Sequence, residues 1–536
     1  MRRPTQGAGA PSQPLGRIAV RDSLGVEGRA SPGGAREVAG GSVLQQIAQV
    51  SGLVVLLVVV TALARRLTPA ELGTYGLVAT LAVYLLILKN SVGNAAVAAM
   101  TAARSDSERV GTFSTCALLY AVTGLVTGLL IAGAGFGIAT GLLEGDLEHQ
   151  ARLGALALGV VTGVGLTATI NLDALRASLL LTRSAANEIA ALAVFAALML
   201  GLIAADADLW LLIAGNGAIP LISGTINGVA RLRLGLPWRL RLSAVTRSGI
   251  GQLLPTAGPL LAIEVSVLVI YGLDRIVLGA FGSPSSVGLY EGPVRAHNVF
   301  YALNGSVAVT ALPTASAYRA AGDEGRLREL AVRGSRYTLA VTVPLAVTAI
   351  VLAGPALEVW LGERYSEGAT ALALLVSYWL LLGQLIVTPN FLVGAGRPRD
   401  AARVVVGIAA LNLALTLALT PSLGLEGPAL GTALAYAVGF PFLLRIGLEA
   451  SGARLGELAR EAWLPAYALG AGLAGLLVAA RLVSDLDTLP QLAPVLFGGP
   501  ALYWLAYAAL VLRPHERALV ADLVRHRGGR GPQPDR

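Results

Sequence analysis

Cysteine, lysine and recognisable catalytic motifs are scarce in this sequence of 536 residues. The single cysteine, Cys116, leaves no partner for an intramolecular disulfide, so redox compartment cannot be inferred from it. Lysine occurs only at Lys89, which excludes the Gly-x-x-x-x-Gly-Lys-(Ser/Thr) loop that cradles nucleotide phosphates. The four histidines show no metal-ligand spacing. The sequence therefore predicts neither a P-loop nucleotide hydrolase nor a metal centre, and it indicates no cofactor.

Charged residues are also few, at 13% of the chain, whereas 55% of the residues are hydrophobic and the mean hydropathy is +0.69. Soluble proteins typically have roughly 25% charged and 45–50% apolar residues. Aromatic residues make up only 5%, whereas there are 65 glycines, which favours closely packed membrane helices over a barrel with aromatic girdles. The composition predicts an all-α integral membrane protein.

The net charge of +8 is best explained by arginine in cytoplasmic loops, so no nucleic-acid partner is expected. Residues 1–42 are rich in Gly, Ala, Pro and Arg and lack an apolar core, which predicts a disordered cytoplasmic tail. Residues 514–536 are predicted to form a second cytoplasmic tail.

About 14 transmembrane helices are predicted, because a helix needs about 20 apolar residues to cross a bilayer. They start near residues 43, 72, 112, 153, 187, 209, 252, 288, 337, 370, 403, 427, 463 and 492. The predicted organisation is a first six-helix half (43–230), a cytoplasmic linker (231–251), a second six-helix half (252–450) and two additional helices (451–513).

The orientation follows from the distribution of Lys and Arg between loops. The predicted inner loops carry 21 of these residues and the predicted outer loops carry five. Positive charge is retained on the cytoplasmic side, so a multi-pass protein of the cell membrane with both termini cytoplasmic is expected. Arginines in the linker are placed to contact anionic lipid headgroups.

A short turn occurs twice, as "RRLTPAELGTYG" (65–76) and "GSPSSVGLYEG" (282–292). Both copies contain Pro-x-x-(Leu/Val)-Gly-x-Tyr, with Gly73 and Tyr75 in the first and Gly288 and Tyr290 in the second. They lie in the first and seventh loops, so the repeating unit contains six helices. An even number keeps the two halves in the same orientation, which predicts a parallel repeat about an axis along the membrane normal.

Five segments, in order, resemble a known family. They are "LARRLTPAELGTYGLV", "LDRIVLGAFGSPSSVGLYEGPVRA", "ALPTASAYRAAGDEGRLREL", "LEVWLGERYSEGA" and "FLVGAGRPRDAARVVVGIAALNLALTLALTPSLGLEGPALGTALA". Together these segments are similar to the polysaccharide flippases of the multidrug/oligosaccharidyl-lipid/polysaccharide exporter superfamily. The resemblance implies a transporter that moves lipid-linked oligosaccharide or polysaccharide precursors from the inner to the outer leaflet, with membrane lipids and this substrate as its partners. Glycosyltransferases or a polymerase of the same pathway are further expected partners.

Three alternatives stay open. A multidrug and toxin extrusion antiporter has the same paired halves but predicts a cavity dominated by acidic groups. A peptidoglycan-precursor flippase belongs to a related family. A membrane glycan polymerase or ligase fits less well, because the longest predicted outer loop has only about fifteen residues and such enzymes usually carry a sizeable outer domain. We therefore expect a transporter and not an enzyme.

Charged residues within spans are costly, at about 2.5–3.5 kcal/mol each on insertion scales, and mark candidate sites. Arg275 and Arg295 are candidate contacts for a substrate diphosphate, because guanidinium can donate two parallel hydrogen bonds to phosphate. The alternative is an internal salt bridge that joins Arg295 to Asp274 or to Glu291. The sequence leaves both interpretations open.

Five further residues are candidates. Glu264 and Asp274 are possible ion-coupling groups, although Glu264 in a packed, protonated state is an equal alternative. Asn94 and Asn390 are candidates to line a sugar path, although hydrogen bonds between helices are the commoner role of such residues. Lys89 is a candidate phosphate contact at the cytoplasmic end, against the simpler interpretation that its side chain reaches the headgroups.

Overall fold

The computed structural model describes residues 32–103, 105–245, 258–514 and 516–517, apart from the side chains at a number of positions within these ranges. All regular secondary structure in these ranges is helical. The helices of the first half are α2 (Pro32–Arg66), α3 (Pro69–Ala102), α4 (Asp106–Leu142), α5 (Gly145–Ala168), α6 (Ile170–Ala177), α7 (Leu181–Ala204), α8 (Leu209–Asn216) and α9 (Ala218–Arg233).

The second half and the C-terminal region continue this all-helical pattern. Their α-helices are α11 (Gly258–Phe281), α12 (Pro284–Ala321), α13 (Glu324–Val351), α14 (Ala353–Leu361), α15 (Ala369–Ser377), α16 (Trp379–Leu382), α17 (Pro389–Gly394), α18 (Pro398–Leu423), α19 (Glu426–Ser451), α20 (Leu455–Leu458), α21 (Leu464–Val483) and α22 (Leu489–Leu510).

Local sequence signals start α3 and α12 in the same way. Thr68 caps α3 in a reciprocal capping box with Glu71, and Pro69 occupies the first turn. Ser283 caps α12 by accepting from the amide of Ser286, and a proline again follows the cap. The repeated turn is therefore a helix start preceded by a tight connection.

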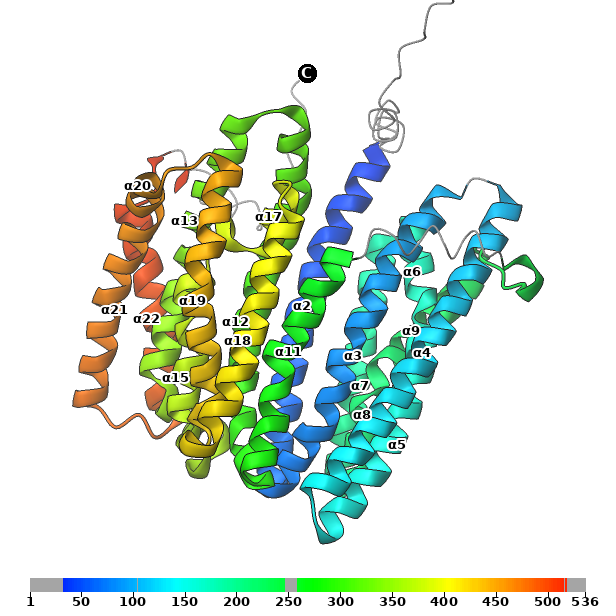
Figure 1. Cartoon of the computed structure of the whole chain (residues 1–536), viewed down its shortest axis with the longest axis horizontal. Coiled ribbons are helices and arrows are strands. Elements are labelled where there is room, and N and C mark those ends of the chain that lie inside the picture. The colour runs from blue at the N-terminus through cyan, green and yellow to red at the C-terminus, as the bar shows by residue number, and fades with distance from the viewer. Residues whose placement is uncertain (1–31, 104, 246–257, 515, 518–536) are drawn as a thin grey trace, which may run out of the picture.

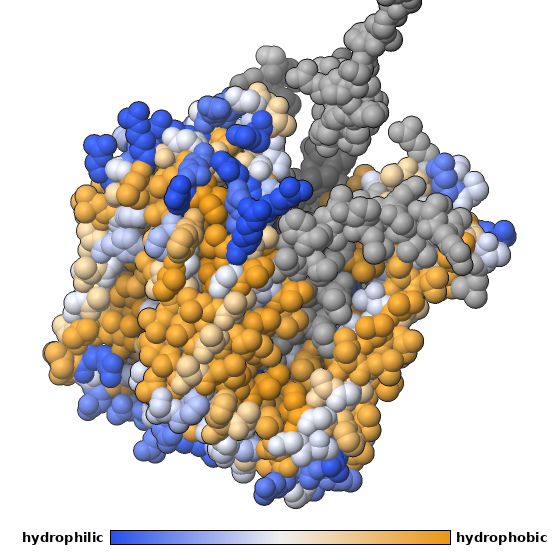
Figure 2. Space-filling model, in the orientation of Figure 1, coloured by the Kyte–Doolittle hydropathy of each residue, from blue (hydrophilic) through white to orange (hydrophobic). Residues whose placement is uncertain are grey.

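Ten helices among the described residues are long and apolar enough to span a membrane, or eleven if the bent pair α8 and α9 forms one span. Helices α3, α11 and α12 also lie at predicted span positions but are not among these ten. The molecule is thus an all-helical, multi-pass membrane protein, and the count of fourteen spans stays a prediction. Figure 2 shows an apolar band across the middle of the visible face, with hydrophilic residues at its upper and lower ends.

Figure 1 shows two helix groups, α3 to α9 on one side and α12 to α22 on the other, with α2 and α11 between them. The α2–α3 and α11–α12 turns meet at the lower end, and the beginning of α2 lies at the upper end. The two groups of helices contact each other at the end where these turns meet.

Two predicted boundaries differ from the structure. Helix α2 begins at Pro32, so residues 32–42, predicted as part of the disordered tail, are helical; proline is tolerated in a first turn. The start of the linker packs onto the first half, where the Trp238 indole N–H donates to Ser178 over 2.9 Å. The rest of the N-terminal tail, most of the C-terminal tail and residues 246–257 lie outside the described residues.

Candidate functional site

Helices α3 and α12 cross at their first turns, where the repeated sequence motif occurs. A Cβ added to Gly73 would lie 1.8 Å from the carbonyl oxygen of Pro284, and one added to Gly288 would lie 1.9 Å from that of Pro69. Real Cβ atoms essentially never come within 3.0 Å of such atoms, so only glycine lets these backbones pass. The contact is reciprocal, as a two-fold relation between the halves requires.

A buried carboxylate lies beside this crossing. Glu291 of α12 is 1% exposed, and a Cβ added to Gly76 of α3 would lie 2.4 Å from its Oε1 atom. Arg275 of α11 donates to this carboxylate, and Arg295 donates to it from one turn along α12 over 3.0 Å. Two guanidinium groups thus hold one carboxylate against the other half of the molecule.

This arrangement answers one question that the sequence left open. Of the two salt bridges considered for Arg295, the structure contains the one to Glu291, at i, i+4. Asp274 instead accepts a hydrogen bond from Tyr290 over 3.1 Å, and its Oδ1 atom has no hydrogen-bond partner among the described residues. Arg275 and Arg295 are only 3% and 7% exposed, so both guanidinium groups are buried in this conformation.

The tyrosines of the two turns play related but different roles. Tyr75 donates to Asn216 of α8 over 2.9 Å within the first half, whereas Tyr290 donates to Asp274 of α11 within the second. Both tyrosines are at most 2% exposed. Each turn is therefore tied to its own helix group, and the glycines make the contact between groups.

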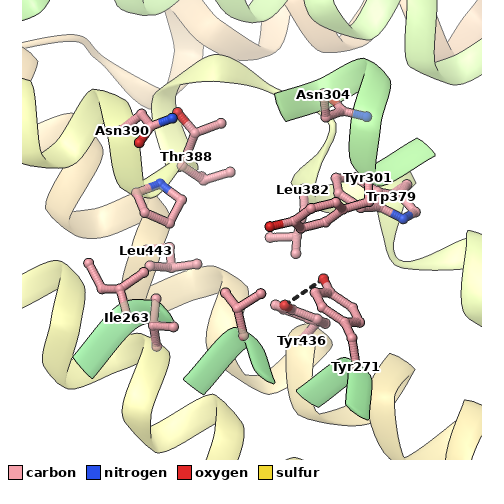
Figure 3. Close-up of a pocket in the computed structure, with 14 residues that line it drawn as sticks. Ile263, Tyr271, Tyr301, Asn304, Trp379, Leu382, Thr388, Asn390, Tyr436 and Leu443 are labelled. Atoms are coloured by element: carbon pink, nitrogen blue, oxygen red, sulfur yellow. Dashed lines mark hydrogen bonds between the residues drawn. The ribbon is translucent and has the colours of Figure 1, made fainter. Parts of the chain in front are cut away.

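A cavity of about 220 Å³ lies within the second half (Figure 3). Aromatic and aliphatic side chains form most of its wall, and none of the described residues that line it is charged. Its lining side chains are Ile263, Val267, Tyr271, Tyr301, Asn304, Trp379, Leu382, Val387, Thr388, Pro389, Asn390, Val405, Tyr436 and Leu443. They come from α11, α12, α16, α17, α18, α19 and the segment between α16 and α17.

Hydrogen bonds hold two tyrosines of the cavity lining, Tyr271 and Tyr436, in place. His297, 1% exposed, bonds to the Tyr378 hydroxyl, which donates to Tyr271 over 3.2 Å. The Tyr271 hydroxyl in turn lies 2.8 Å from that of Tyr436, the pair joined by a dashed line in Figure 3. The rings of Tyr378 and Tyr436 stack with centroids 4.6 Å apart. The cavity surface is therefore preorganised by a continuous chain of polar contacts.

Polar groups lie on two sides of the cavity. Figure 3 places Thr388 and Asn390 across from the rings of Tyr301 and Trp379, with Asn304 at the same end. The Asn304 amide is already occupied, since it donates to the Phe300 carbonyl and accepts from Thr342. The half-buried Asn390, by contrast, makes no hydrogen bond to the described residues. Its amide is available to a ligand.

A second polar cluster occupies the first half. Lys89 lies 3.3 Å from the Oδ2 atom of Asp173, which is 1% exposed and also accepts from Tyr120 over 2.5 Å. Arg176 bridges Asp173 to Glu188 of α7, with N–O distances of 3.4 and 3.1 Å. Lys89 therefore pairs within the protein, and an interaction with the headgroups does not account for its position in this conformation.

The structure thus places the predicted site residues in three separate regions. Arg275, Arg295 and Asp274 lie near the helix crossing, Asn390 lines the cavity and Lys89 belongs to the first-half cluster. The side chains of Asn94 and Glu264 lie outside the described residues. No group of three or more His, Cys, Asp or Glu side chains in the described part of the chain is arranged to hold a metal ion.

Sequence reasoning missed the aromatic wall and Asp173. The signal for the wall was the concentration of scarce aromatic residues in apolar spans, at Tyr271, Tyr301, the pair Tyr378 and Trp379, and Tyr436. Periodicity could not show that these four distant segments meet. Asp173 lies in the short helix α6, and its partner Lys89 lies far away in the sequence, so no local pattern indicated their pairing.

Comparisons with known proteins agree with this architecture. Residues 62–370 match the family model described as "Polysaccharide biosynthesis protein". Two relatives come from Haloferax volcanii: "Probable flippase AglR" is 28% identical over 172 residues, and "Probable low-salt glycan biosynthesis flippase Agl15" is 24% identical over 166. Each alignment covers 31% of this chain, and the chain spans about a third of the relatives' length, 36% and 35% respectively.

Two solved structures share the fold at low sequence identity. An inward-facing multidrug resistance MATE transporter of the MOP superfamily has a TM-score of 0.64 at 13% identity, covering 77% of this chain and 98% of that one. The lipid II flippase MurJ in an inward closed conformation also scores 0.64, at 14% identity, with 88% and 100% covered. Because the family model matches more than half of the sequence, the chain belongs to the family described as "Polysaccharide biosynthesis protein".

Proposed function

We propose that this protein flips lipid-linked oligosaccharide or polysaccharide precursors from the inner to the outer leaflet of the cell membrane, for cell-surface polysaccharide biosynthesis. Family membership and the named flippase relatives support this function. The arginine distribution supports cytoplasmic termini, with the helix crossing on the outer side. On this proposal the protein performs no covalent chemistry, and the enzymes that assemble and polymerise the glycan act before and after it.

The reciprocal crossing of α3 and α12 at one end of the two helix groups is the structural observation that most directly supports this function. A flippase must expose its substrate path to one leaflet at a time, and closure at the outer end is one of the two required states. The buried Glu291 between Arg275 and Arg295 adds a polar contact to that closure. In this state the two arginines serve as counter-ions of Glu291, so a phosphate role would require the carboxylate to withdraw.

Covalently joining the two halves tests this mechanism. The Trp360 indole N–H of α14 donates to the Thr61 hydroxyl of α2 over 2.5 Å, so cysteines at these positions are within reach of a short bismaleimide. In a Cys116→Ala background, cross-linked protein in vesicles should lose transfer of a fluorescent lipid-linked oligosaccharide between leaflets. Reduction of a cleavable version of the reagent should restore transfer.

A cross-link within one helix group provides the matched control. Arg328 of α13 and Glu457 of α20 form a salt bridge with an N–O distance of 2.5 Å, both within the C-terminal helix group. Cysteines joined there should leave transfer intact. Equal activity with and without the link between Thr61 and Trp360 would contradict movement of the halves, and absence of transfer by the uncross-linked protein would contradict the flippase function itself.

The same vesicles distinguish the related transport functions. The antiporter alternative predicts acidic groups in the binding cavity, whereas the described lining of the cavity in the second half has none. Vesicles that move a cationic dye but no lipid-linked sugar would favour the antiporter. Transfer restricted to a peptidoglycan precursor would favour the peptidoglycan-precursor flippase.

A further inference from the structure

The cavity in the second half is shaped for something smaller than a whole lipid-linked glycan. Its volume of about 220 Å³ lies below the roughly 300–1,000 Å³ of pockets that enclose drug-sized ligands. Its wall combines fixed aromatic rings with a few amide and hydroxyl groups, and Tyr301 and Trp379 lie across the cavity from Asn390 and Thr388 (Figure 3). A flat ring could place its apolar face against the aromatic side chains and its polar edge against the amide and hydroxyl groups.

The charge of the site restricts the ligand further. None of the described lining residues is charged, and the nearby cations Arg275 and Arg295 are engaged by Glu291. A phosphate or uronate placed here would lose its hydration without gaining a counter-ion, which is strongly unfavourable. This cavity therefore disfavours an anionic group.

We infer that this cavity is a subsite for one uncharged sugar ring of the transported glycan, held between the Tyr301 and Trp379 rings and the Asn390 amide. The C–H face of a pyranose packs on aromatic rings, while its hydroxyls hydrogen-bond to amides and tyrosines. This inference rests on the proposed function, because the ring would belong to the transported glycan. The proposed sugar subsite is therefore separate from the buried charges beside the helix crossing.

Asn390 allows a test that leaves the fold intact. Its amide makes no hydrogen bond to the described residues, so its replacement removes no internal contact of that kind. Asn390→Ala should weaken binding of a neutral sugar about fivefold, the effect of one net hydrogen bond. Asn390→Leu should abolish binding, because the larger apolar side chain fills the polar side of the cavity. Gln49→Ala is the matched control, since Gln49 lines a pocket in the first half.

Binding is measured by saturation-transfer NMR on the purified full chain in nanodiscs. The probes are the methyl glycosides of glucose, galactose, mannose and N-acetylglucosamine, with methyl glucuronide as the charged counterpart and geraniol as a lipid-chain mimic. We expect transfer to at least one neutral glycoside, lost in Asn390→Leu, retained in Gln49→Ala and absent for the glucuronide.

Three results would overturn the subsite: no neutral glycoside bound by the wild type, equal transfer to the Asn390→Leu variant, or a signal sensitive to this substitution only for glucuronide or geraniol. The vesicle transfer assay keeps this failure distinct from that of the proposed function. Wild-type protein that flips a lipid-linked oligosaccharide but shows any of these results refutes the subsite alone. Wild-type protein that binds the glycoside but flips nothing refutes the transport function.

Discussion

Replacing Gly73 or Gly288 with alanine should shift the molecule away from the state in which α3 and α12 touch. Each new methyl carbon would start 1.8 or 1.9 Å from a carbonyl oxygen of the opposing helix, and relief requires a separation of at least 3.0 Å. The obstacle is backbone, so no side-chain rotation can relieve it. The two helices must move apart by more than 1 Å or the crossing must open.

The expected magnitude follows from the cost of overpacking. Extra carbon atoms in a packed interface typically cost about 1–3 kcal/mol. If this cost falls only on the closed state, the equilibrium between closed and open crossings shifts by about 5–150-fold. Alanine substitutions at Gly73 and Gly288 act on the same crossing, so their combined effect should be smaller than the sum of the two single effects.

A buried reporter at the crossing makes this shift measurable. Thr74 is fully buried and its hydroxyl has no hydrogen-bond partner among the described residues, so Thr74→Cys in a Cys116→Ala background disturbs little. The rate of its reaction with a water-soluble maleimide should rise with the open population. Gly137→Ala is the control, because Gly137 is exposed on α4 and nothing lies within 4 Å of an added Cβ.

We expect faster labelling in Gly73→Ala and Gly288→Ala and an unchanged rate in Gly137→Ala. Thermal unfolding measured in parallel separates opening of the crossing from general loss of structure. An unchanged labelling rate in folded Gly73→Ala protein would show that the backbones of α3 and α12 are not held this close. The inferred closure at this crossing would then be wrong.

Three other substitutions give independent tests by thermal unfolding. Glu291→Gln removes the carboxylate between two buried arginines and should cost about 3–5 kcal/mol, whereas Glu329→Gln in an exposed pair should cost little; equal losses would contradict the buried pairing. Burial opposes ionisation of Glu516, but hydrogen bonds from a tyrosine and a backbone amide and the charge of a nearby arginine lower its pKa from 4.5 to about 2. The stability that Glu516→Gln removes should therefore be fully present above pH 4.5 and disappear as the pH falls toward 2, and a loss independent of pH would refute the ionised contact. Asp173→Asn should destabilise more than Lys89→Met, because the carboxylate binds three partners and the ammonium pairs with one; the reverse order would contradict the cluster.

Hydropathy and turn chemistry predicted much of the fold. Apolar length located the helices, and the two turns at Gly73 and Gly288 indicated related halves before any contact was known. The sequence also identified Glu291 as one of two possible partners of Arg295, because an i, i+4 spacing on one helix is local information. It could not show that the two turns touch each other, since that depends on how the halves pack.

The candidate site was less predictable for the same reason. Asn390 was identified as a sugar-path candidate because a polar amide beside a membrane span is conspicuous. Tyr271, Tyr378 and Tyr436 were not identified, because an isolated tyrosine in an apolar span is ordinary and only their convergence forms a surface. Arg275 was expected to meet phosphate, yet its carboxylate partner lies sixteen residues away on the neighbouring helix.

On the proposed function, the buried charges at the crossing and the proposed sugar subsite have separate roles. A carboxylate held by two guanidiniums is favourable only while all three stay together, so it suits a contact that forms or breaks with the closure of α3 against α12. A neutral aromatic cavity, by contrast, binds without reorganising buried charge, and its hydroxyl chain runs through His297 within the second half alone. Movement at the crossing can therefore change which side the path faces while the cavity keeps its shape. The two sets of substitutions should accordingly separate: those at Gly73 and Gly288 should alter labelling and transfer but not glycoside affinity, and those at Asn390 should alter affinity but not the labelling rate at Thr74.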